Sequence, residues 1–218
     1  MTEAPNEFPL EPGGFRDVVR HPEAHAVILA QYRVGEHAGV VALRRLLDEM
    51  EPEGKLRRAM EIHHRDEARH SRLFGDWIRR LGLEPPPLPA DVEGFFARSP
   101  EEFREHRRMI EQLPAELRRI LVFAAINAIE RLAYTQFEHH LLALDRPEDV
   151  SALEGVMAEE KFHLTYVEAE LERQAQGPNG ALVTTALEQA RARFADFREM
   201  RETETRQAIE RLLGTAPR

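Results

Sequence analysis

Hydrophobic residues recur every three or four positions along most of this chain. This spacing is typical of amphipathic helices, which bury one apolar stripe and expose the remaining faces. Proline occupies the first turn of several of these segments, where its missing N–H costs nothing. Helices are predicted over residues 22–50, 52–82, 99–109, 114–144, 147–176 and 180–213. The pattern therefore predicts an all-α fold.

The links between the predicted helices differ in length. Two of the links are so short that residues 22–82 and 114–176 must each fold as an antiparallel hairpin. The proline-rich segment between them is long enough to cross from one end of a bundle to the other. This predicts an antiparallel four-helix bundle with one long crossover. The expected organisation is one domain over 1–218, with an arm at 1–20, the bundle at 22–176, a crossover at 83–113 and an additional C-terminal helix at 180–213. That last helix is predicted to pack outside the bundle or at a subunit contact.

A Glu-x-x-His pair interrupts the apolar stripe of two of these helices. The pairs are Glu67 with His70 and Glu160 with His163. Residues three apart share one face of a helix, so each carboxylate and imidazole point the same way. Burying an unpaired carboxylate costs several kcal/mol or more, so each pair needs a partner, and a metal ion is the obvious one.

About thirty residues before each pair, a single glutamate lies on the apolar stripe of the preceding helix. These glutamates are Glu36 and Glu130. Helices of similar length in an antiparallel bundle have their midpoints at one level, so all four positions are expected to converge. Four carboxylates would neutralise two divalent cations. Oxygen and imidazole ligands suit iron or manganese.

This arrangement resembles the ferritin-like di-iron carboxylate superfamily, in which two helices each supply a Glu and two others each supply Glu-x-x-His. The resemblance covers roughly residues 22–176. It implies a metal-ligand set of Glu36, Glu67, His70, Glu130, Glu160 and His163. The four glutamates are then the expected catalytic residues. Two Fe ions are the implied cofactor, with Mn/Fe or two Mn as alternatives and O2 as co-substrate.

The residues beside the ligands sharpen the resemblance. The sequence Asp66-Glu67-Ala68-Arg69-His70 looks like the Asp-Glu-x-Arg-His motif of di-iron monooxygenases and acyl desaturases, whereas the second pair has Phe162 where Arg is common. Metal-bound imidazoles usually donate their other N–H to a carboxylate. Asp66 is therefore predicted to orient His163, and Glu159 to orient His70.

Several other polar residues near these stripes are further candidates. His63 is a seventh ligand, a proton donor or a core histidine, and the last is favoured. Tyr32 and Tyr134 either take part in chemistry or only pack, and packing is favoured. Asn127 is a candidate for a pocket wall.

Three further features concern exposure and volume. A third Glu-x-x-His, Glu61 with His64, faces about 120° away from the stripe among arginines and is predicted to lie on the surface. His139 and His140 are expected to be partly exposed. The small residues around Glu36, including Gly39, suggest either a pocket or close helix packing.

Composition narrows the function. A net charge of −9 argues against nucleic acid as a partner. The absence of cysteine excludes disulfides, iron–sulfur clusters and a rubredoxin-type centre, so electrons must come from an external donor such as a ferredoxin or a reductase. No apolar run reaches the ~20 residues that span a bilayer, and the N-terminus lacks the features of a signal peptide. A cytoplasmic protein without membrane contact is expected.

The expected function is a non-haem di-iron oxidase or oxygenase that activates dioxygen to oxidise a small, apolar organic substrate. The alternative is a ferroxidase, iron-storage or peroxide-scavenging protein of the ferritin or rubrerythrin kind. A site that holds metal only for structure is the third option. The oligomeric state stays open, with a homodimer as one option.

Overall fold

The computed structural model describes residues 12–50, 54–89 and 101–214, and the regular structure within these ranges is entirely helical. This confirms the predicted all-α class. The helices are α1 (Pro12–Arg20), α2 (Pro22–Met50), α3 (Gly54–Arg80), α5 (Glu101–Glu111), α6 (Ala115–Leu141), α7 (Pro147–Ala175) and α8 (Gly180–Leu213). Within the same described ranges, no helix is long and apolar enough to cross a bilayer.

The predicted helix boundaries agree with the structure to within a few residues. Helices α2 and α7 begin at the prolines that mark them, Pro22 and Pro147, and α8 ends at Leu213 as expected. The predicted starts at Pro52 and Ser99 lie outside the described residues.

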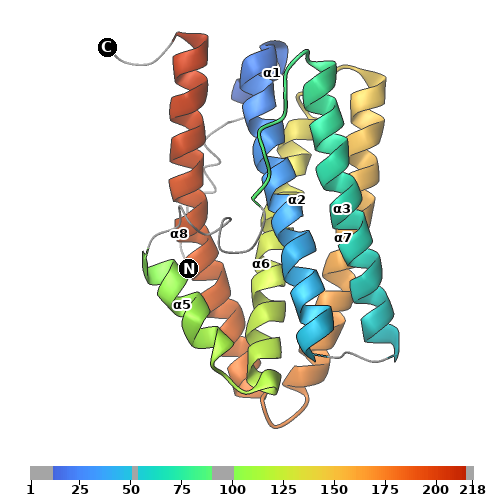
Figure 1. Cartoon of the computed structure of the whole chain (residues 1–218), viewed down its shortest axis with the longest axis vertical. Coiled ribbons are helices and arrows are strands. Elements are labelled where there is room, and N and C mark those ends of the chain that lie inside the picture. The colour runs from blue at the N-terminus through green and yellow to red at the C-terminus, as the bar shows by residue number, and fades with distance from the viewer. Residues whose placement is uncertain (1–11, 51–53, 90–100, 215–218) are drawn as a thin grey trace.

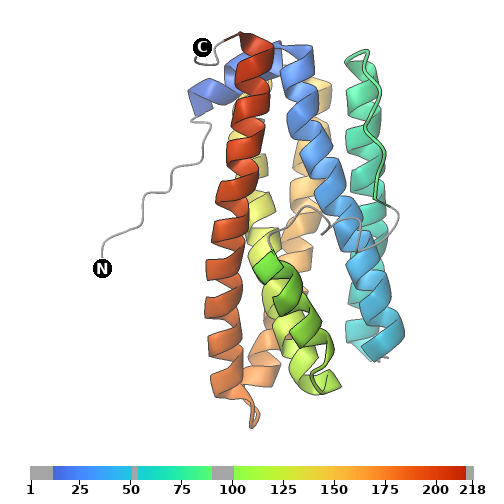
Figure 2. The same ribbon diagram turned by 60° about the vertical axis from the view of Figure 1, so that its left-hand side comes forward.

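Four long helices form the body of the molecule. Figure 1 shows α2 beside α3 and α6 beside α7, as the two predicted hairpins require. Helix α3 also contacts α7, and α2 contacts α6. Helix α8 packs along α6 and touches α2 and α7, so it lies on the outside of this bundle, as Figure 2 shows from another side.

The core has two separate apolar clusters, one toward each end of the bundle. One cluster includes Leu43, Phe123 and Val167, and the other includes Leu29 and Phe137. Along each long helix, the predicted ligands fall between residues of the first cluster and residues of the second. The fold therefore places a polar layer midway along the bundle, with apolar packing on either side. This layer consists of Glu36, His63, Glu67, His70, Glu130, Glu160 and His163.

The N-terminal segment predicted as an arm is helical from Pro12 to Arg20 and packs on the bundle. Phe15 and Val18 are buried in the core, and Phe15 stacks on His140 with ring centroids 5.6 Å apart. The prediction that His140 is partly exposed was wrong, because α1 helps to cover this end of α6 and leaves His140 fully buried. His139 is half-buried.

The first part of the crossover runs back along α2. Arg33 donates from Nη1 to the Pro86 carbonyl oxygen, and His37 Nε2 lies 2.9 Å from the Pro89 carbonyl oxygen. These contacts hold the proline-rich segment against the bundle, where Figure 1 shows it as irregular coil.

Candidate metal centre

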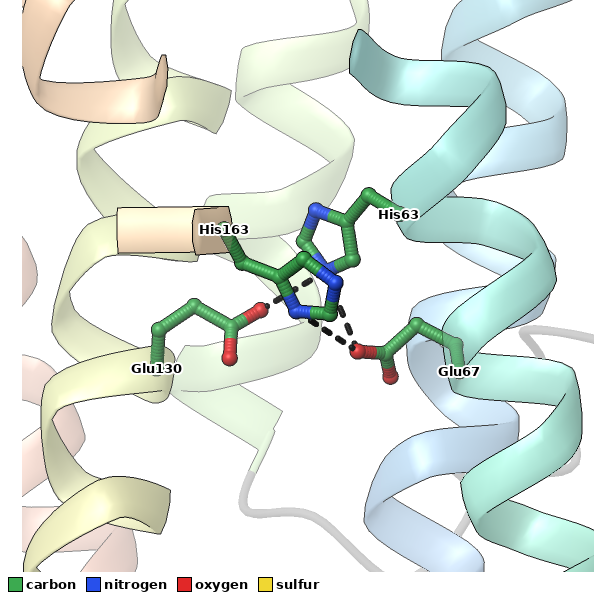
Figure 3. A group of neighbouring side chains, drawn as sticks. All are labelled: His63, Glu67, Glu130 and His163. Atoms are coloured by element: carbon green, nitrogen blue, oxygen red, sulfur yellow. Dashed lines mark hydrogen bonds and ion pairs between the residues drawn. The ribbon is translucent and has the colours of Figure 1, made fainter. Parts of the chain in front are cut away.

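The six residues predicted as ligands lie together in the polar layer. They belong to two groups in which one ligand atom from each residue lies within 4.8 Å of the others. The first group is His63, Glu67, Glu130 and His163, shown in Figure 3, and the second is Glu36, Glu67, His70 and Glu160. Every member is buried, and Glu67 belongs to both groups. The two groups share one carboxylate, and each could hold a metal ion.

Helical spacing explains why these side chains meet. On α3 the buried face runs through Met60, His63, Glu67, His70 and Phe74, at steps of three and four residues. On α7 the same face carries Val156, Glu160, His163 and Val167. The polar side chains are therefore aimed inward by the apolar neighbours that bury each stripe.

His70 presents one ring nitrogen to the layer and the other to a flanking carboxylate. Its Nδ1 lies 3.0 Å from Glu36 Oε2 and 3.1 Å from Glu160 Oε1. Its Nε2 lies 2.6 Å from Glu159 Oε2. The pairing of Glu159 with His70 that the sequence predicted is confirmed.

His163 is oriented in the same way. Its Nδ1 lies 2.9 Å from Glu160 Oε2 and 3.7 Å from Glu67 Oε1. Its Nε2 lies 3.4 Å from Asp66 Oδ2, a longer contact than that between Glu159 and His70. Both histidines thus direct Nδ1 inward and are held from behind by an acidic residue, the arrangement usual for imidazoles that bind metals.

Arg69 connects the two flanking carboxylates, a role that sequence reasoning missed. Its Nη2 donates to Asp66 Oδ1 at 2.8 Å and also to Glu159 Oε2. The pKa of Arg69 is raised, chiefly by its hydrogen bond to Glu159. The arginine of the Asp-Glu-x-Arg-His motif was the signal available in the sequence.

His63 lies within the layer and contacts the glutamates directly. Its Nε2 is 3.0 Å from Glu67 Oε1 and 2.9 Å from Glu130 Oε1. Its ring stacks on that of His163 at a centroid distance of 3.6 Å, and its Nδ1 lies 2.8 Å from the hydroxyl of Tyr166. His63 is buried and has polar partners, as expected for a core histidine. Those partners are predicted metal ligands, so its position also fits the alternative of a seventh ligand.

Buried carboxylates lie close together in the layer and shift one another's pKa values. Burial raises the pKa of Glu67, and the nearby charge of Glu36 adds to the effect. Burial, followed by the charge of Glu160, raises the pKa of Glu130 to about 7. For His70, burial lowers the pKa, but contacts with Glu160 and Glu36 outweigh it and raise the value to about 12. Cations would relieve this mutual repulsion of buried carboxylates.

The donor set fits a pair of divalent ions. Glu160 Oε1 is buried and has no contact of regular hydrogen-bond geometry among the described residues, although His70 Nδ1 lies 3.1 Å away. A cation could therefore bind both atoms. The donors are carboxylate oxygens and imidazole nitrogens, which suit iron and manganese, and the chain has no cysteine to favour a softer metal.

Gly39 provides the space that the shared carboxylate occupies. A Cβ added at Gly39 would overlap Glu67 Oε2, whereas one added at Gly35 would meet nothing within 4 Å. Of the two interpretations drawn from the sequence, close packing therefore applies at Gly39, and what packs there is the Glu67 side chain.

The remaining candidates do not belong to the two groups. Tyr32 packs on Phe74 and Phe137, and its buried hydroxyl has no hydrogen-bond partner among the described residues. Asn127 Nδ2 lies 3.3 Å from Glu168 Oε1, and Tyr134 is half-buried.

The third Glu-x-x-His is a surface pair. Glu61 is exposed and forms an ion pair with Arg57 at 2.9 Å. His64 is half-buried, and neither residue belongs to the two groups of candidate ligands. The surface position predicted from the arginine-rich face is confirmed for Glu61, whereas His64 is partly covered.

Comparisons of this chain with protein-family models, with curated proteins and with solved structures find no match. The assignment of the site therefore depends on the residues themselves and on their geometry.

Proposed function

We propose that the protein is a ferritin-like di-iron protein that activates dioxygen and oxidises a small, apolar organic substrate. The observation that carries the proposal is the pair of buried four-residue groups that share Glu67. Two helical hairpins with a long crossover between them support the ferritin-like connectivity. Manganese in one or both positions is the alternative metal content.

Six residues would hold the two ions, and Glu67 would contact both. Two redox-active ions in these positions would supply electrons to dioxygen, which is the chemistry that such centres contribute. The chain holds the donors in place: Glu159 and Asp66 fix the orientation of His70 and His163 through their Nε2 atoms. Orientation of this kind raises the basicity of the imidazole ligand.

The protein also keeps the layer dry. Apolar clusters pack on both sides of it, with Phe74 and Phe137 on one side and Phe123 and Met60 on the other, all at most 1% exposed. Exclusion of water strengthens the electrostatic interactions in the site and limits side reactions of reactive oxygen species. This environment is suited to an apolar substrate.

Electrons would come from an external protein or small molecule. The chain has no cysteine and therefore no iron–sulfur or rubredoxin centre of its own. A ferredoxin or a reductase is the proposed donor, and the cytoplasm the proposed location.

Anaerobic titration of the metal-free protein with ferrous iron, followed by exposure to oxygen, tests the proposal. Saturation at about two irons per chain and a transient absorption band on oxygen exposure are expected. The variant Glu67→Ala should lose this binding, whereas the matched surface variant Glu61→Ala with His64→Ala should keep it.

Other outcomes of the titration decide against the proposal. Uptake far beyond two irons per chain would favour the storage and ferroxidase alternative. Two bound irons that do not react with oxygen would leave a structural site. Absence of binding in the unmodified protein would overturn the metal centre itself.

A further inference from the structure

We propose that His63 is a seventh metal ligand and that it makes the two metal positions chemically unequal. The inference rests on the proposed dinuclear site. One position then has two imidazoles and two carboxylates, from His63, His163, Glu67 and Glu130. The other has a single imidazole, from His70 with Glu36, Glu67 and Glu160. The ligand pattern of two Glu and two Glu-x-x-His does not include this third histidine.

The first support is the position of the ring. His63 Nε2 lies between two carboxylates, 2.9 Å from Glu130 Oε1 and 3.0 Å from Glu67 Oε1. Figure 3 shows the imidazole of His63 over that of His163, between the helices that carry Glu67 and Glu130. A nitrogen that faces two carboxylate oxygens at hydrogen-bond distance is placed to share a cation with them after a small shift.

The second support is the partner of the other nitrogen. His70 and His163 each direct one nitrogen into the layer and hold the second against an oxygen atom outside it. His63 has the same arrangement, because its Nδ1 lies 2.8 Å from the hydroxyl oxygen of Tyr166. When Nε2 binds a metal, the proton stays on Nδ1, and the Tyr166 oxygen is in position to accept a hydrogen bond from this N–H. Tyr166 is thus the positioning residue for His63.

The third support is the packing of the Tyr166 ring. The side chain packs against Phe123 and Phe162, with ring centroids 6.4 Å and 5.9 Å away. This packing holds the hydroxyl oxygen beside His63 Nδ1, where it can accept a hydrogen bond from the ring N–H without adding a charged group to a layer already rich in carboxylates.

The two positions are expected to differ in affinity. Imidazole favours the later divalent ions of the first transition series, whereas carboxylate oxygen suits manganese and magnesium. The position with His63 and His163 should bind Co²⁺ first and more tightly. The position with His70 should fill second.

Titration of the metal-free protein with Co²⁺ under anaerobic conditions tests the inference without relying on activity. Proton NMR of the loaded protein is the second readout, because each metal-bound imidazole gives a strongly shifted, exchangeable ring N–H signal. Three such signals and two binding steps are expected for the unmodified protein. His63→Leu should leave two signals and weaken the first step by at least about tenfold.

Two further variants complete the design. Tyr166→Phe should keep the fold and weaken the same step by about tenfold, because it removes only the oxygen that faces His63 Nδ1. His64→Leu, on the neighbouring residue that lies outside both groups, should change neither readout. Circular dichroism of each metal-free variant checks that it is folded.

Failure of this inference can be told apart from failure of the proposed function. If two Co²⁺ ions bind but only two shifted N–H signals appear, His63 is not a ligand and the dinuclear site remains. The same conclusion follows if the Co²⁺ binding steps are unchanged in Tyr166→Phe and in a folded His63→Leu variant. No Co²⁺ bound by the unmodified protein would overturn both.

Discussion

His70 in the mid-height layer and the pair of His25 and His140 near one end of the bundle are all buried, but their pKa values are shifted in opposite directions. In the mid-height layer, contacts with Glu160 and Glu36 outweigh the effect of burial and raise the pKa of His70 to about 12. Toward the end covered by α1, His25 and His140 face each other with their Nε2 atoms 3.0 Å apart. Burial lowers the pKa of His25 to about 4, and burial together with the charge of His25 lowers that of His140 to about 3.

The neighbours of each group account for the difference. The rings around His140 are those of Phe15, Tyr32 and Trp77, none of which carries a charge. Without a carboxylate, the histidines stay neutral and pair with each other. Burial of histidine is therefore no sign of a metal site by itself, and the carboxylates at hydrogen-bond distance are what distinguish the layer.

The largest expected effect comes from Glu67→Ala, since Glu67 belongs to both groups of ligands. Its loss should weaken the binding of both ions by more than about 100-fold, beyond the effect usual for residues that only orient ligands. Calorimetric titration with ferrous iron checks this. If Glu67→Ala bound iron as tightly as the unmodified protein, the layer would not be a metal centre.

The second prediction concerns the pair of His25 and His140 and its dependence on pH. Above pH 6.5 both residues are neutral in the folded and the unfolded chain, so their pairing contributes fully. As the pH falls below 6.5, the unfolded chain takes up protons that the folded one resists, and stability is lost toward the folded pKa values of about 4 and about 3. The loss at pH 5 should be about 2 kcal/mol per histidine.

Urea unfolding of the metal-free protein at pH 7 and pH 5 measures this loss. The double variant His25→Leu with His140→Leu removes both titrating groups, so its stability should fall less between the two pH values. An equal fall in the variant and the unmodified protein would show that the pair does not resist protonation.

The third prediction separates the flanking carboxylates from the ligands. Glu159→Gln and Asp66→Asn should each weaken metal binding by about 10- to 100-fold. Glu159→Gln should have the larger effect, because its contact with a histidine is 2.6 Å long against 3.4 Å for Asp66. Asp76→Asn is a matched control, since Asp76 lies on α3 as Asp66 does and pairs with Arg79 on the exposed face of that helix. Equal affinities in all three variants would contradict the orienting role.

The smallest effect on overall stability is expected at two glycines of α2. Gly35→Ala should stabilise the helix by up to about 1 kcal/mol, because its Cβ meets nothing and alanine favours helix. Gly39→Ala should weaken metal binding, since its Cβ would displace the Glu67 carboxylate. Thermal unfolding and metal titration of both variants check the contrast, which would disappear if Glu67 could move without loss of binding.

Much of the fold could be predicted because its signals are local. Proline at helix starts set the first residues of α2 and α7, and the apolar stripes showed which face of each helix is buried. The same stripes placed Glu67 and Glu160 inside, and the arginine-rich face of Glu61 placed that residue outside.

The features that sequence reasoning missed depend on distant contacts. His140 is buried partly by α1, and nothing near it in the sequence indicates that cover. His63 lies on the stripe as any core histidine would, so that interpretation was favoured, and its contacts with Glu130 and Tyr166 were not predicted. Both partners come from other helices.

Anomalous X-ray diffraction from crystals loaded anaerobically with ferrous iron would locate the metal positions. Two iron peaks are expected in the layer, about 3.5–4 Å apart, with Glu67 between them. A single peak, no peak in this layer, or iron bound instead at Glu61 and His64 would show that the layer is not a di-iron centre.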